Sequence, residues 1–69
     1  MTSLKDRLLA AHADDDRQAL IALYTEAADS TADTDAACFY LTHAYIFALE
    51  AGDPAADGLR TRLKAHGRV

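Results

Sequence analysis

The sequence predicts an all-α fold: four short helices arranged as two antiparallel helical hairpins around a central apolar helix. Three observations predict this class. Sixteen of the 69 residues are alanine, the strongest helix former, while glycine occurs three times and proline once. The stretch from about residue 35 to residue 51 is apolar almost throughout, and short polar breaks separate it from amphipathic segments. Because the breaks are only a few residues long, neighbouring helices are expected to be antiparallel.

The first hairpin is expected to comprise two helices. Ser3 followed by Asp6 is typical of a capping box, and a helix from about Leu4 to Ala13 follows it. The run Asp14–Asp16 then offers a carboxylate as the cap of a second helix, which extends to about Ala28. The predicted inward positions are Leu4, Leu8 and Ala11 in the first helix and Ala19, Leu20, Leu23, Tyr24, Ala27 and Ala28 in the second. The break is predicted from the caps alone, so one continuous helix would contradict the hairpin.

The second hairpin begins with the central helix. A polar loop over residues 29–34 precedes it, and Asp33 or Thr34 is its expected cap. Gly52 suits the left-handed conformation that ends a helix, and Asp53 with Pro54 supplies the start of the next one. That last helix is expected from about Pro54 to Ala65. Its predicted inward positions are Ala55, Ala56, Leu59, Leu63 and His66.

The two predicted hairpins are similar in sequence after a shift of 39 residues. The shift places Leu8 on Phe47, Ala13 on Gly52, Asp14 on Asp53, Leu20 on Leu59 and Tyr24 on Leu63. A repeat of this length is typical of helix-pair arrays. The second hairpin resembles a tetratricopeptide-type (TPR-like) helix, turn and helix at Ala44-Tyr45, Ala48-Leu49, Gly52-Asp53, Leu59 and Leu63. The resemblance implies a scaffold that binds protein partners on a helical face and carries out no chemistry.

The length and composition predict a single small helical domain over residues 1–69. A chain of this size buries only about 60% of its unfolded surface on folding, so additional stabilisation is expected. Cys38 is the one cysteine and the histidines lack zinc-finger spacing, which leaves self-association or an unknown protein partner. A free thiol and the lack of a signal-peptide pattern predict a cytoplasmic location. No membrane partner is expected, because the central helix is too short and too polar to cross a bilayer.

The two sides of the central helix differ in chemistry on a helical wheel. One side is predicted core and consists of Leu41, Tyr45, Ala48 and Leu49. The other side combines aromatic residues with a histidine and an acid: Ala36, Phe39, Tyr40, His43, Phe47 and Glu50. This mixture is typical of a surface that is buried only in a complex, so a homodimer is predicted with Phe39, Tyr40, His43, Phe47 and Glu50 in its interface. Ordinary core packing on both sides is the alternative.

The charged residues are distributed unevenly. All 11 acids lie within residues 1–58, and Arg60, Arg62, Lys64 and Arg68 follow without an acid among them. These four cations are a candidate patch for nucleic acid or another acidic ligand. They also complement the negative end of the last helix, and the acidic remainder of the chain lacks a broad phosphate-binding face. Nucleic acid is therefore not expected as the principal partner.

Motifs for catalysis, cofactors or metals are not found in the sequence, which contains no Gly-rich phosphate loop, zinc signature or nucleophile elbow. Cys38 and His43 project in different directions on a helix and do not form a nucleophile and base pair. His12 beside Asp14–Asp16 has the ligand types for a divalent ion, but helix capping explains these acids better. The leading hypothesis is a non-catalytic protein–protein interaction module that self-associates through the central helix. A small enzyme or accessory subunit using His43 and an acidic-ligand binder are the alternatives.

Overall fold

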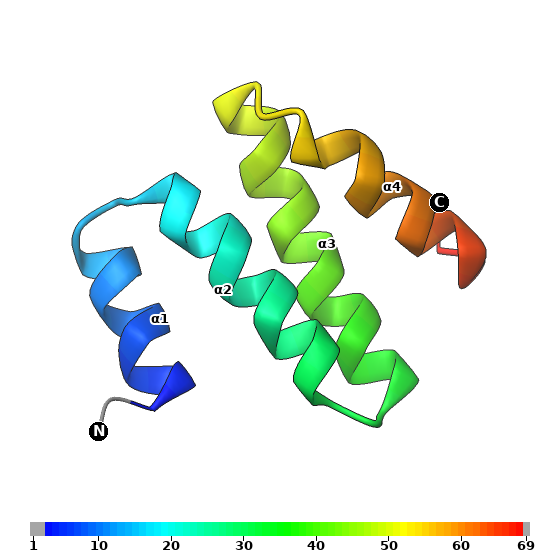
Figure 1. Ribbon diagram of the computed structural model, residues 1–69, viewed down its shortest axis with the longest axis horizontal. Helices are drawn as coiled ribbons and strands as arrows, with labels where there is room; N and C mark the ends of the chain where they lie inside the picture. Colours follow the sequence, from blue (N-terminus) through cyan, green and yellow to red (C-terminus); the bar gives the residue numbers. More distant parts are fainter. Residues whose placement is uncertain (1–2, 69) are drawn as a thin grey trace.

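The computed structural model describes residues 3–68, and α-helix is the only regular secondary structure in that range (Figure 1). Its helices are α1 (Leu4–Ala13), α2 (Arg17–Ser30), α3 (Thr34–Ala51) and α4 (Ala55–Ala65). The predicted all-α class with four helices is confirmed, and the helix boundaries lie close to the predicted ones.

The four helices form a thin layer. The Cα atoms extend over 34 × 28 × 12 Å. The shortest of these dimensions is less than two stacked helices require, because their axes alone lie about 8–10 Å apart and each adds a Cα radius of about 2.3 Å. Figure 1 shows α1 to α4 in chain order across the layer, with the chain reversing direction at each connection and α4 crossing α3 obliquely. Each helix packs on its neighbours in the sequence.

The predicted break between α1 and α2 is confirmed, and aspartates form both sides of it. Asp15 has a φ of 53°, the left-handed conformation that terminates α1. The backbone N–H of Asp16 donates to the carbonyl oxygen of Ala11 at 3.0 Å, which completes a Schellman motif. The Asp16 carboxylate then caps α2 by accepting from the backbone N–H of Ala19 at 3.1 Å. One short run of aspartates thus ends one helix and starts the next.

Replacing Asp15 with glycine is expected to raise the free energy of unfolding by about 0.5 kcal/mol. A side chain disfavours the left-handed conformation, and the greater flexibility of glycine in the unfolded chain offsets part of the gain. Asp14→Gly is the matched control, because Asp14 has a φ of −86° and gains nothing from glycine. Urea unfolding measures both variants, and a less stable Asp15→Gly chain would contradict the expectation.

Local hydrogen bonds also set the ends of α3, as predicted. The Asp33 carboxylate accepts from the backbone N–H of Asp35 at 2.9 Å and so caps the first turn. Gly52 ends α3 with a φ of 63°, and open space surrounds the position that a Cβ atom would take. Its backbone conformation, rather than a lack of room, therefore favours glycine. The Asp53 carboxylate then accepts from the backbone N–H of Ala55 at 2.8 Å at the start of α4.

The buried side chains form two clusters. The larger joins α2, α3 and α4 and consists of Ile21, Ala28, Cys38, Leu41, Ala44, Ala48, Leu59 and Leu63. The smaller joins α1 and α2 and consists of Ala11, Leu20 and Leu23. Tyr24 of α2 and Phe47 of α3 are half-buried and pack against both clusters. Since α3 supplies half of the larger cluster and touches the smaller one, it is the central helix of the fold.

Three predicted inward positions are wrong. Leu49 is 56% exposed, because α2 and α4 pack against the other half of α3. Ala55 is exposed in the first turn of α4, before the turns that pack on α3. His66 is exposed because it is the C-cap residue, where the helical stripe ends. Ile21 was not predicted to be inward, yet it is buried.

Candidate functional site

Three large apolar side chains on α3 are exposed to solvent. Phe39 is 58% exposed and Ile46 is 49% exposed, and Leu49 follows them on the same helix. Thr42 lies between Phe39 and Ile46 in the sequence, and the four residues are spaced three or four positions apart. This spacing keeps their side chains on one face of the helix. The Thr42 hydroxyl donates to the Cys38 carbonyl oxygen at 2.8 Å, so it needs no outside partner. We call Phe39, Thr42, Ile46 and Leu49 the α3 stripe.

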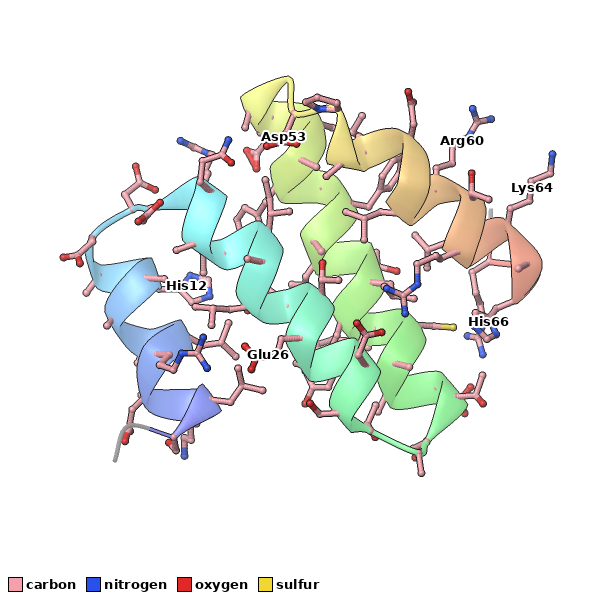
Figure 2. The ribbon with its side chains drawn as sticks, viewed as in Figure 1. His12, Glu26, Asp53, Arg60, Lys64 and His66 are labelled. Atoms are coloured by element: carbon pink, nitrogen blue, oxygen red, sulfur yellow. The ribbon has the colours of Figure 1, made fainter. Side chains whose placement is uncertain are left out.

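Ring side chains from three helices pack together beside the α3 stripe. Tyr24 of α2 stacks on His43 with ring centroids 5.2 Å apart and on Phe47 at 5.8 Å. His12 extends from α1 toward α2 (Figure 2), and its Nε2 lies 2.9 Å from the Tyr24 hydroxyl oxygen. Tyr40 lies at the edge, with its ring centroid 6.3 Å from that of Tyr24. We call His12, Tyr24, Tyr40, His43 and Phe47 the Tyr24 cluster.

The residues predicted for the dimer interface are Phe39, Tyr40, His43, Phe47 and Glu50. Phe39 belongs to the α3 stripe and Tyr40, His43 and Phe47 belong to the Tyr24 cluster, whereas Glu50 belongs to neither. Phe39 and Glu50 are exposed, whereas the other three are half-buried and pack against Tyr24 within the chain. His43 joins the two features, because its Nδ1 donates to the Phe39 carbonyl oxygen at 2.9 Å and its ring centroid lies 4.4 Å from that of Phe39. The Tyr24 cluster therefore supports the α3 stripe from the side.

Sequence reasoning missed Ile46 and Leu49 as members of the exposed surface. The signal that identifies them is their spacing from Phe39, which is seven and ten residues. The signal is weak in this helix because apolar residues surround it, so several stripes fit the sequence equally well. Only the packing of α2 and α4 shows which of them stays exposed.

Removing the Tyr24 hydroxyl with Tyr24→Phe is expected to lower the free energy of unfolding by about 0.5–1 kcal/mol. The variant loses the hydrogen bond to His12 and keeps the ring stacking, so the loss is that of one net hydrogen bond. Tyr45→Phe is the matched control, since among the described residues the Tyr45 hydroxyl has no hydrogen-bond partner and its ring is also half-buried. Chemical denaturation compares the two, and equal effects would contradict the role of the His12 contact.

The His43 and Cys38 side chains are both occupied by packing contacts within the chain. His43 donates one ring nitrogen to a backbone carbonyl and is held between the rings of Phe39 and Tyr24. Cys38 is a free thiol that is 3% exposed, so it has little access to a substrate. Over residues 3–68, no three His, Cys, Asp or Glu side chains come together in a way that would hold a metal ion.

The four cations near the C-terminus divide into two pairs. Arg62 forms an ion pair with Asp29 of α2, and Arg68 forms one with Asp35 of α3. The hydrogen bond that the Arg68 guanidinium donates to the Asp35 carboxylate raises the pKa of Arg68, which therefore stays charged. Arg60 and Lys64 form no ion pair with the described residues, and their side chains point away from α3 (Figure 2). Together with Asp57 and Thr61 they line an open groove of about 290 Å³ on α4.

The chain matches no protein-family model, no curated protein and no solved structure. The functional conclusion therefore rests on the geometry described above. None of the described helices has the length and hydropathy needed to cross a membrane.

Proposed function

We propose that this chain is a non-catalytic protein–protein interaction module that self-associates through α3. The observation that carries the proposal is the α3 stripe, whose three large apolar side chains are each about half exposed or more. Adjacent exposed apolar side chains on a soluble protein usually mark a contact surface. A second copy placed on the stripe adds a second layer of helices, which is the usual way a helical layer covers its apolar side. The buried free thiol of Cys38 supports a cytoplasmic location.

The small size of the chain supports the same proposal. The described residues contain no disulfide, and the larger buried cluster comprises eight side chains, three of them alanine. A domain of this size commonly gains stability from association when it lacks a disulfide or metal. Because only the folded chain dimerises, self-association raises the free energy of unfolding by mass action.

A relationship to the tetratricopeptide-type repeats is part of this proposal. What supports it is the similar construction of the two hairpin turns. A left-handed residue, Asp15 or Gly52, ends the first helix of each hairpin, so the two turns correspond at a shift of 37 residues rather than the 39 that the sequence alignment used. An aspartate, Asp16 or Asp53, follows directly and accepts a backbone hydrogen bond at the start of the second helix. A scaffold of this kind presents helical faces to protein partners.

Sedimentation-velocity ultracentrifugation of the parent chain over a range of micromolar concentrations tests the proposal. A dimer is expected, together with a melting temperature that rises with protein concentration. A monomer with a cooperative, concentration-independent melt would show that the exposed stripe is tolerated in one chain, and self-association would be abandoned.

Binding of an acidic ligand by α4 is a second candidate function, favoured by the groove that Arg60 and Lys64 line. Only these two of the four cations are free of ion pairs with described residues, and Asp57 shares the groove. Two contacts to a polyanion predict weak binding that falls only about tenfold between 50 and 200 mM salt, whereas an apolar α3 interface tolerates salt. Retention on heparin at several salt concentrations, with the Arg60→Ala and Lys64→Ala double variant as the control, separates the two candidates.

A further inference from the structure

We propose that α4 is a releasable cover on α3, latched at its C-terminal end by Arg62 and Arg68, and that it opens while α2 and α3 stay packed together. Each of these two arginines pairs with an aspartate of a different helix. Opening uncovers a buried part of α3 that borders the α3 stripe, so α4 controls how much apolar surface α3 presents. The inference concerns a single chain and stands whether or not the chain self-associates.

The apolar contact that holds α4 is small. Leu59 and Leu63 are the buried residues of α4, and Ala56 is half-buried beside them. The helix packs on α3 alone, because it lies at the edge of the layer (Figure 1). Tyr24 and Phe47, by contrast, join α2 to α3 by ring stacking in which α4 takes no part. A region with few buried apolar contacts opens at a lower free-energy cost than the whole chain, so α4 is expected to open first of these three helices.

Two exposed ion pairs hold the C-terminal half of α4. Arg62 pairs with Asp29 in the last turn of α2, and Arg68 pairs with Asp35 in the first turn of α3. Gly67 has a φ of 71° and turns the chain after α4, immediately before Arg68. Because all four charged side chains are exposed to solvent, each pair adds only a little to the docking of α4 and is weakened by salt. Such a latch keeps α4 closed most of the time and still lets it open.

Cys38 lies under the latched end of α4. Asp35 precedes it by three residues and Thr42 follows it by four, so these side chains share one side of α3. Arg68 on Asp35 is thus about one helical turn from the thiol, which is the next contributor after the Asp35 hydrogen bond to the raised pKa of Arg68. Phe47, which faces α2, is nine residues from Cys38 and projects roughly 180° away around the helix. Cys38 is nevertheless only 3% exposed, so α4 is the helix that covers it.

Thiol labelling tests the latch, because Cys38 is the one cysteine in the sequence. The folded chain is mixed with a maleimide, and mass spectrometry follows the rate at which the thiol is modified. The double variant Arg62→Gln, Arg68→Gln removes both ion pairs and is expected to label roughly twofold to twentyfold faster than the parent. The matched control is Arg60→Gln with Lys64→Gln, which takes two charges from the same helix without breaking an ion pair of the described residues. It should label at the parent's rate, and equal rates for the two double variants would overturn the inference.

The urea dependence of labelling separates release of α4 from unfolding of the whole chain. Below the unfolding transition, the logarithm of the labelling rate should rise less steeply with urea than the logarithm of the unfolding constant measured by circular dichroism. The reason is that release of one helix exposes less surface than complete unfolding. Equal slopes would show that Cys38 reacts only in the unfolded chain, and α4 would then not be a separate cover. A parent chain that labels as fast as an unstructured cysteine peptide would show that α4 does not cover the thiol, which also overturns the inference.

Discussion

The double variant Phe39→Asp, Leu49→Asp is expected to be a monomer with an intact fold. Both side chains are more than half exposed within one chain, so the folded monomer loses chiefly the ring contacts of Phe39 with Tyr40 and His43 when they are replaced. A dimer of this variant would bury four carboxylates with no counter-charge among the stripe residues, and burying an unpaired charge costs several kcal/mol. The dissociation constant should rise at least about a thousandfold, which corresponds to roughly 4 kcal/mol. Sedimentation velocity measures the mass, and circular dichroism measures the helix content.

A matched control carries the same changes away from the stripe. Leu9 of α1 and Ala22 of α2 are exposed, so Leu9→Asp with Ala22→Asp adds two carboxylates without touching α3. This variant should remain a dimer. Phe47→Asp is unsuitable for the test, because Phe47 stacks on Tyr24 and its loss would weaken the fold of each chain. Dimerisation of the stripe variant at the parent's concentration would place the contact surface elsewhere.

The helix boundaries were predictable from sequence because they depend on local hydrogen bonds. Ser3, Asp16 and Asp33 each accept a backbone N–H within three residues of themselves, so the signal and its structural consequence lie together. Gly52 is predictable for the same reason, since one residue's backbone conformation ends the helix. The run Asp14–Asp16 predicted the break between α1 and α2 less strongly than Gly52 predicted the end of α3. The break forms there because Asp15 adopts the left-handed conformation that glycine usually takes.

The rotation of α3 about its own axis was not predictable to the same degree. The helix is apolar nearly all round, so its periodicity does not define which side faces inward. Leu49 was placed with the core and Phe47 with the exposed side, whereas Leu49 is exposed and Phe47 is half-buried. The packing of α2 and α4 decides between them, and that contact is between segments distant in the sequence.

The four cations near the C-terminus show the same limit of prediction from sequence, here for charge. The sequence alone places them together after residue 58. Arg62 and Arg68 each pair with an acid 33 residues earlier in the chain, so the local count overstates the charge available to a ligand. Exposed ion pairs of this kind add little stability, but they do occupy the arginines.

Leu41→Ala is expected to remove at least about half of the free energy of unfolding of the chain at 25 °C. Leu41 is 1% exposed in the larger buried cluster, and a leucine to alanine change at such a site costs about 2.7–5 kcal/mol. A small domain has only roughly 5 kcal/mol in total, so the loss approaches its whole stability. Leu49→Ala is the matched control, because it makes the same change on the same helix at an exposed position. It should keep the fold of the chain and weaken the dimer instead. Circular dichroism and urea unfolding at low micromolar concentration compare the two, and a cooperatively folded Leu41→Ala chain that loses less than about 1 kcal/mol would show that the core does not depend on α3 in the way its burial indicates.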